Sequence, residues 1–185
     1  SAPGGYTHYA FYNMPTPGFV QEVLDSYVQG ALMAYKKAKD GQQSAVLEYG
    51  KSAFNLDSPV SFNRSMNAYL QNPEVQEGVF GSEAHCAVDK NMRALLIKNE
   101  NGELKSAINW FAVHTTSIRN TNKLITPDNK GYAALNVEQE FDENVVAIFA
   151  QGDAGDVSPN WIWDKKLKVM RGQFEDQYQN ARFNA

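Results

Sequence analysis

Two short segments of this sequence carry side chains that could do chemistry. The first is His114, followed by three hydroxyl residues at 115–117. An imidazole can ligate a metal ion, most often zinc, and neighbouring hydroxyls could orient it or bind a substrate. The chain has three histidines, and none forms a local pair with metal-binding spacing. The spacing alone therefore favours a structural histidine held within the fold.

The second segment, with sequence GDVSPN at 155–160, places Ser158 between two glycines, at 152 and 155, and Pro159. Such a turn can present a hydroxyl and backbone N–H groups to a substrate oxyanion. The competing interpretation is an ordinary turn in which Asp156 and Ser158 bond their own backbone. The residues by themselves slightly favour the ordinary turn.

Three further candidates stand outside these segments. Arg64 could clamp a carbonyl or carboxylate with its fork of donors, or pair with a surface acid, and surface pairing is favoured. His8 lies among aromatic residues, which favours packing between rings. His85 and Cys86 are adjacent, but two potential ligands do not make a metal site.

A tryptophan pair and a lysine run follow the serine segment. Trp161, Trp163 and the lysines within 165–168 are residue types that suit a lipid interface. A solvated loop with two partly buried indoles would explain them equally.

The elements that must position these residues alternate between helices and strands. Apolar spacing predicts helices over 17–40, over 128–140 and from about Met170 onward, and strands over 44–49, 92–97, 104–113 and 145–150. Thr16 is expected to cap the first helix, and Asp128 or Asn129 could cap the second. Asn101-Gly102 suits the turn of a hairpin because both residues accept positive φ at low cost. Residues 54–73 are expected to be irregular. The pattern predicts an α/β fold, a layered mixed β-sheet with flanking helices.

Composition excludes several classes of protein. The chain has 185 residues, 43% hydrophobic and 21% charged, which argues against disorder. Its net charge of -4 gives no electrostatic reason to expect nucleic acid as a partner. No apolar run approaches the ~20 residues that cross a bilayer, and the single cysteine cannot form an intramolecular disulfide. The sequence also lacks the usual serine-hydrolase elbow, phosphate loop, dinucleotide fingerprint and His-Glu-x-x-His motif.

Four segments together resemble one family. The hexapeptide at 155–160 resembles the serine segment of the neutral/alkaline, non-lysosomal ceramidases. The other three occur in the family's order: PGGYTHY at 3–9, NRS followed by AYLQNP within 63–73, and WFAVHTTS at 110–117. Each segment is weak alone, and the ordered set is specific.

The resemblance implies a zinc-dependent amidase that cleaves the N-acyl bond of ceramide to give sphingosine and a fatty acid. It implies that His114 is a zinc ligand, Ser158 the active-site serine and Arg64 an arginine near the scissile amide. Whether Ser158 or a zinc-activated water is the nucleophile stays open. It further implies ceramide or a related N-acyl lipid as partner, a membrane surface as the place where that lipid is met, and a secreted or periplasmic location.

The same resemblance implies that residues 1–185 are part of a larger catalytic domain. The family's His-x-His motif lies before the segment that matches Ser1, and its glutamate and tyrosine ligands lie beyond the hexapeptide. With one of four ligands, this segment alone is expected to bind zinc weakly or not at all. Met66, Asn67 and Thr115 depart from the family pattern. These departures bear on whether ceramide itself or another N-acyl lipid is cleaved. Two alternatives stand beside this expectation: a non-catalytic lipid-binding or structural fragment, and a metal-independent serine amidase that uses Ser158, Asp156 and a histidine.

Overall fold

A computed structural model describes residues 5–9, 18–53, 59–76, 83–141 and 144–185. The chain separates into two compact units, residues 1–44 and residues 45–185, and each is described by itself. The residues predicted to cap and begin the first helix, Thr16 and Pro17, lie outside the described residues.

The first unit is built around one long helix, α2 (Gln21–Asp40), which confirms the helix predicted there. Lys37 and Lys39 lie in its last turn, where positive charge complements the helix dipole. The helix ends as the N–H of Gly41 donates to the carbonyl of Lys37 at 3.1 Å. At the other end, the N–H of Val20 donates to the carbonyl of Gly5 at 2.7 Å.

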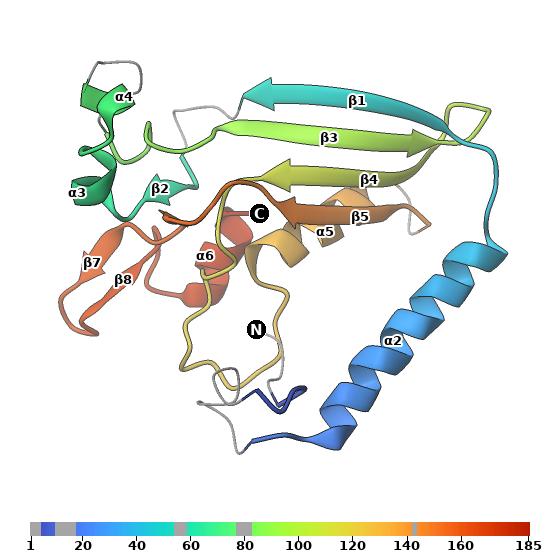
Figure 1. Ribbon diagram of the computed structural model, residues 1–185, viewed down its shortest axis with the longest axis horizontal. Helices are drawn as coiled ribbons and strands as arrows, with labels where there is room; N and C mark the ends of the chain where they lie inside the picture. The colour runs from blue at the N-terminus through green and yellow to red at the C-terminus, as the bar shows by residue number, and fades with distance from the viewer. Residues whose placement is uncertain (1–4, 10–17, 54–58, 77–82, 142–143) are drawn as a thin grey trace. The chain divides into compact units, whose positions relative to one another are not determined.

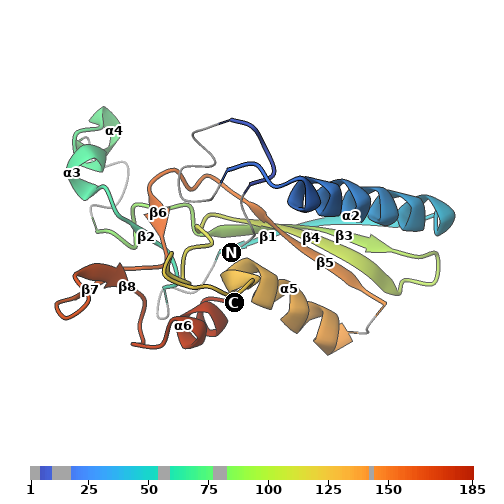
Figure 2. The ribbon, with the colours of Figure 1, turned by 90° about the horizontal axis from the view of Figure 1, so that it is seen from below.

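The second unit contains a four-stranded mixed sheet, as predicted (Figure 1). Its strands, in the order of the sheet, are β1 (Val46–Ala53), β3 (Asn91–Lys98), β4 (Leu104–Phe111) and β5 (Val146–Gln151). The first two pairs are antiparallel, and β4 and β5 are parallel. Parallel neighbours need a crossover, and this one runs through α5 (Asp128–Phe141), which lies against one face of the sheet (Figure 2).

The predicted hairpin joins β3 to β4. Gly102 has φ of 83°, but Asn101 does not share the positive φ expected of it. The side chain of Asn99 instead organises the turn, because its Oδ1 accepts the N–H groups of Asn101 and Glu103. β1 lies at the edge of the sheet and is exposed along its whole length.

Residues 54–73, expected to be irregular, contain short elements in their described part. These are β2 (Phe62–Asn63), α3 (Met66–Tyr69) and the start of α4 (Pro73–Gln76). β2 pairs antiparallel with β6 (Val157–Ser158), as Figure 2 shows. Two-residue strands carry almost no periodicity, so the sequence gives no signal for this pairing.

The predicted start of the last helix was wrong. Met170 lies in strand β8 (Val169–Arg171), which pairs with β7 (Ile162–Asp164), and the helix α6 spans Gln177–Phe183. The hairpin forms because the Asp164 carboxylate accepts the N–H groups of Leu167 and Lys166, bonds that lower its pKa below the ordinary value. Asp176 then caps α6 by accepting the N–H of Tyr178.

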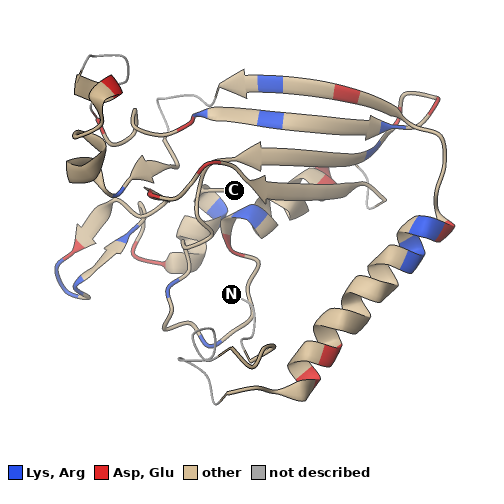
Figure 3. Cartoon of the chain, in the orientation of Figure 1, with Lys and Arg blue, Asp and Glu red and all other residues tan. Residues whose placement is uncertain are grey.

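The best-packed part of the second unit lies around the end of β4. One buried cluster contains Val60, Phe111 and Val113, and a second contains Ala112, Ala154 and Val157. Charges of both signs lie on the exposed strands (Figure 3). Among the described helices, none is long and apolar enough to span a bilayer. The core therefore supports the end of the sheet where the two candidate segments emerge.

Candidate active site

The two candidate segments leave the sheet at the same edge. β4 and β5 are parallel, so the chain that follows each strand emerges on one side. Gly152 brings them together, because its N–H donates to the carbonyl of Phe111 at 3.0 Å. A Cβ at Gly152 would lie 3.1 Å from the nitrogen of Ala112, so only glycine fits this close approach without a shift.

His114 contacts the serine segment directly. Its Nδ1 lies 2.7 Å from the carbonyl oxygen of Val157, the residue before Ser158. A carbonyl can only accept a hydrogen bond, so Nδ1 carries the proton and donates it. In the neutral ring this leaves the lone pair on Nε2, as a metal ligand or a general base requires. The half-buried imidazole borders an open cavity of about 580 Å³, which residues 151–156 also line.

Ser158 is buried, and its hydroxyl bonds within its own loop. Its Oγ accepts the N–H of Asn160 at 3.0 Å, the contact that the ordinary-turn interpretation predicts. Asn160 also reaches the histidine segment, because its Nδ2 donates to the carbonyl of Thr116 at 2.7 Å. Asp156 behaves differently from that interpretation: its carboxylate accepts Nδ2 of Asn63 at 2.7 Å.

Arg64 lies against the serine segment. The β2–β6 pairing carries it there, and its backbone N–H donates to the carbonyl of Asp156 at 2.8 Å. Its exposed guanidinium donates from Nη2 to the carbonyl of Gly155 at 3.3 Å. The structure thus brings the segments of Arg64, His114 and Ser158 together, although Arg64 and Gly155 are 91 residues apart in sequence.

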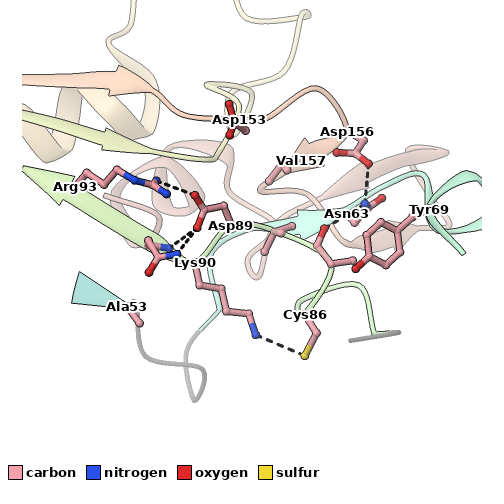
Figure 4. Close-up of a pocket in the computed structure, with 13 residues that line it drawn as sticks. Ala53, Asn63, Tyr69, Cys86, Asp89, Lys90, Arg93, Asp153, Asp156 and Val157 are labelled. Carbon is pink, nitrogen blue, oxygen red and sulfur yellow. Dashed lines mark hydrogen bonds and ion pairs between the residues drawn. The ribbon is translucent and has the colours of Figure 1, made fainter. Parts of the chain in front are cut away.

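A second cavity of about 660 Å³ adjoins these segments, and Figure 4 shows its lining. Asp153 and Asp156 line both cavities. Also in the lining of this second cavity, Asp89 pairs with Arg93 at 2.7 Å. Burial raises the pKa of Asp89, but hydrogen bonds from Asn91 and Arg93 outweigh it and leave the pKa below its ordinary value. Asp89 is therefore a carboxylate at neutral pH.

The start of α5 supplies polar contacts that the sequence indicated only as a helix cap. The Asp128 carboxylate accepts the N–H groups of Ser117 and Ile118 at 3.1 and 3.0 Å. Asn129 donates from Nδ2 to the carbonyl of His114 at 3.1 Å and to Oγ of Ser117 at 3.2 Å. The loop that carries His114 is thus held from α5 as well as from the serine segment.

Lys130 continues this set of contacts. Its Nζ donates to the carbonyls of Phe111 and Ala150 at 2.8 and 2.6 Å, so it bridges the ends of β4 and β5. Burial of its ammonium group lowers the pKa of Lys130 to about 8. A single lysine in the first turn of a helix gives no signal in the sequence for this bridge.

Comparison with known proteins decides the family. The family model described as neutral/alkaline non-lysosomal ceramidase, N-terminal, matches residues 1–176. The chain belongs to this ceramidase family. The family is one of amidohydrolases, and its fold agrees with the mixed α/β sheet and flanking helices seen here.

Relatives of this ceramidase-family chain come from bacteria and eukaryotes. It is 38% identical over 184 residues to a neutral ceramidase of Pseudomonas aeruginosa, covering 98% of this chain and 26% of that protein. It is 39% identical over 169 residues to neutral ceramidase B of Dictyostelium discoideum, covering 86% and 22%. The crystal structure of the Pseudomonas aeruginosa neutral ceramidase matches with a TM-score of 0.83 at 35% identity, over 100% of this chain and 28% of that one. The chain thus spans about a quarter of the length of these relatives.

The described residues of this ceramidase-family chain also include one cluster of three metal-ligating side chains, Glu83, His85 and Cys86. Their ligand atoms lie within 4.8 Å of one another, so the structure adds a third ligand to the pair seen in the sequence. Each of these atoms already has a partner: Nε2 of His85 lies 3.3 Å from the Glu83 carboxylate, and Nζ of Lys90 donates to Sγ of Cys86 at 3.5 Å (Figure 4). The donor types suit zinc, but a cation would have to displace the lysine.

His8, the third histidine, stacks on a ring as its aromatic surroundings predict. The ring centroids of His8 and Phe19 are 3.9 Å apart at an interplanar angle of 24°. Of the histidines, His114 alone has Nδ1 bonded to a backbone carbonyl and also lines one of the cavities given above, among the contacts of the described residues. His114 therefore fits a metal ligand best.

Proposed function

We propose that residues 1–185 form the central part of the catalytic domain of a longer, zinc-dependent ceramidase. That enzyme hydrolyses the N-acyl amide bond of ceramide to sphingosine and a fatty acid. Support comes from the family and from relatives named neutral ceramidase. One observation carries the proposal: the 2.7 Å hydrogen bond from Nδ1 of His114 to the carbonyl of Val157 joins the metal-binding residue to the serine segment.

In this proposal His114 would hold the zinc ion through Nε2. The other ligands would come from parts of the longer protein outside residues 1–185. Bound zinc polarises a carbonyl oxygen and makes a coordinated water more acidic. The main-chain bond at Nδ1 fixes the tautomer and the plane of the ring before the metal arrives. A ligand that is already oriented loses less freedom on binding, which favours the metal-bound state.

Ser158 acts on the substrate through its hydroxyl proton. A hydroxyl has one proton to donate and two lone pairs that can accept. The N–H of Asn160 occupies one lone pair, so the O–H of Ser158 stays free to donate toward the amide or a base. Asn160 also donates from Nδ2 to the carbonyl of Thr116, so the serine segment adjoins the histidine segment. This arrangement serves either role left open for Ser158, as nucleophile or as a group that positions the amide.

Arg64 holds the acyl carbonyl. Its Nη2 bond to Gly155 uses one N–H of the guanidinium, and the exposed remainder can donate to a substrate oxygen. A positive donor beside the scissile amide stabilises the negative charge that develops on its oxygen. Loss of Arg64 should therefore affect the transition state as well as substrate binding.

The metal-independent serine amidase finds less support. In a serine triad, a carboxylate accepts the proton on Nδ1 of the histidine, while Nε2 faces the serine. Nδ1 of His114 faces a main-chain carbonyl, and the Asp156 carboxylate is engaged with Asn63. The proposal therefore keeps zinc as the group that activates the amide.

Ceramide is a membrane lipid, so the enzyme meets it at a lipid surface. Trp161 and Trp163 are 45% and 54% exposed, and lysines follow them at 165, 166 and 168. Exposed indoles beside lysines suit the interface between headgroups and acyl chains. Export from the cell, which the family resemblance implies, places the enzyme at an outer surface. Cell fractionation tests the location, and recovery only in the cytosol would contradict it.

The test of the proposal is fatty-acid release from an N-acylsphingosine by the full-length protein that contains this chain. We expect hydrolysis that stops with a zinc chelator and returns when zinc is added back. Hydrolysis that resists the chelator would favour the serine amidase. Binding of ceramide vesicles without hydrolysis would favour a lipid-binding fragment.

A further inference from the structure

Three consecutive polar residues at the start of α5 bond segments outside their own helix. Asp128 and Asn129 are 2% and 0% exposed, and Lys130 is half-buried. Burying two polar side chains and an ammonium group is unfavourable unless each finds partners. Their partners lie in the segments around the candidate active site.

Asp128 also has an unusual backbone. Its φ is 53°, in the left-handed region that side chains other than glycine rarely adopt. Both of its carboxylate oxygens accept N–H groups of the loop after His114, and Oδ1 also accepts the N–H of Asn129 at 2.7 Å. A buried residue in such a conformation persists only when its surroundings hold it, and such residues cluster at functional sites.

Asn129 holds the main chain of the proposed metal ligand itself. Its Nδ2 uses both protons, one on the carbonyl of His114 and one on Oγ of Ser117, while Oδ1 accepts the N–H of Lys130 at 2.7 Å. Lys130 then fixes the ends of β4 and β5, three residues before His114 and before Asp153. A helix cap would explain bonds to the first turn of α5, but it does not explain these bonds to the loop and strand ends.

We propose that Asp128, Asn129 and Lys130 are positioning residues that set the direction of Nε2 of His114 and its register against the serine segment. The proposal rests on His114 as the zinc ligand. Asn129 fixes one end of the His114 residue at its carbonyl, and Val157 fixes the other end at the ring. With both ends held, the imidazole has one direction in which to present its lone pair. Outer partners of this kind commonly change metal affinity about 10- to 100-fold when they are lost.

Asn129→Asp tests the proposal in the full-length protein, because it keeps the shape and removes both Nδ2 donors. Asn180→Asp is the matched control. Asn180 is 2% exposed and bonds Phe174 in both directions, through Oδ1 and Nδ2, outside the contacts of His114. Both variants should lose thermal stability to a similar extent.

Zinc dissociation, kcat and KM for an N-acylsphingosine then separate positioning from stability. We expect Asn129→Asp to weaken zinc binding by about 10- to 100-fold and to lower kcat with little change in KM. Asn180→Asp should leave zinc affinity and kcat within about twofold of the parent. Equal zinc affinity and kcat in the two variants would overturn the proposal.

A second variant decides the matter if Asn129→Asp does not fold. Lys130→Met removes the bonds to Phe111 and Ala150 from a side chain that is only half-buried. We expect weaker zinc binding again, and unchanged zinc affinity would contradict the proposal. His114→Ala keeps the two proposals apart: if it retains zinc, the proposed function fails. If it loses zinc while Asn129→Asp and Lys130→Met do not, only the positioning proposal fails.

Discussion

Metal-ligating side chains occur in two regions of this chain, the loop after β4 and the turn at residues 83–86. The loop offers one ligand, His114, within a set of bonds from β6 and α5. The turn offers three kinds of ligand atom within 4.8 Å, but the side chain of Glu83 is 72% exposed. The turn has more ligands, and the loop holds its ligand more firmly.

The difference teaches how a histidine is prepared to bind a metal ion. The hydrogen-bond partner of its second ring nitrogen is more important than the number of other ligands nearby. In the loop, a main-chain carbonyl accepts the Nδ1 proton of His114, which leaves the lone pair on Nε2, and the residue lines a cavity. In the turn, Nε2 of His85 faces a carboxylate and Sγ of Cys86 faces an ammonium group. A cation entering the turn must break those contacts first.

The largest expected effect concerns the residues that would act on the substrate. His114→Ala and Ser158→Ala should each lower kcat/KM of the full-length protein by about 1,000-fold or more, because each removes a group that acts in the transition state. His85→Ala is the matched control and should stay within about twofold. Fatty-acid release from an N-acylsphingosine measures all three. If His85→Ala were the crippled variant, the two regions would exchange their roles.

Asn63 connects the turn at residues 83–86 to the serine segment, which in turn contacts the loop after β4, and its loss should give the next largest effect. It is 4% exposed, its Nδ2 donates to Asp156 and to the carbonyl of Ala87, and its N–H donates to the carbonyl of Ala84. Asn63→Ala should lower the free energy of unfolding by about 1–3 kcal/mol, because buried partners lose their donor. Activity should fall as Arg64 and the serine segment shift.

Denaturant unfolding and kcat/KM measure the effect of Asn63→Ala. Asn91→Ala is a control from the lining of the same cavity, since that side chain bonds only Asp89 among the contacts of the described residues. The control should keep its activity. A stable, fully active Asn63→Ala protein would show that the link between the regions is unimportant.

Two glycines of the serine segment should differ in a smaller but clear way. A Cβ at Gly152 would lie 3.1 Å from Ala112 N and Phe111 C, whereas a Cβ at Gly155 would meet nothing within 4 Å. Gly152→Ala should cost about 1–3 kcal/mol of stability, and Gly155→Ala about 0.5 kcal/mol or less. Thermal unfolding of the two variants measures the difference. Equal losses would mean that the close approach after β4 and β5 is not tight.

The smallest expected effect is the pH dependence contributed by Lys130, because solvent screens the charge of this half-exposed side chain. Burial lowers its pKa to about 8 from 10.5, so between these values the unfolded chain binds more protons than the folded one. The charged lysine therefore weakens the fold below pH 8, and this penalty disappears as the pH rises toward 10.5. The free energy of unfolding of the parent should rise relative to Lys130→Met across that window. Parallel curves from pH 7 to 10.5 would contradict the lowered pKa.

The sequence predicted the main elements because their signals are long and periodic. α2, the β3–β4 hairpin, α5 and β5 all formed where apolar spacing placed them. It could not predict β2 and β6, because two-residue strands have no period and their pairing is a long-range event. The strand at Met170 was mistaken for a helix because the turn that begins its hairpin depends on the side chain of Asp164.

For the site, the sequence indicated the residue types and the family resemblance indicated their roles. Neither could show that Nδ1 of His114 meets the carbonyl of Val157, because a main-chain acceptor leaves no residue-specific signal. The same reason hid Asn129 and Lys130, whose partners are also main-chain carbonyls. Asp128 or Asn129 was predicted to cap α5, and the bonds of Asp128 to the loop at 117–118 emerge only in three dimensions.

The zinc content of the purified full-length protein tests the central claim most directly. Mass spectrometry of the metal should find zinc in the parent and in His85→Ala at the same molar ratio, and little or none in His114→Ala. That result would assign the metal to the loop after β4. Zinc that persists in His114→Ala and is lost in His85→Ala would contradict the account and assign the metal to the turn at residues 83–86.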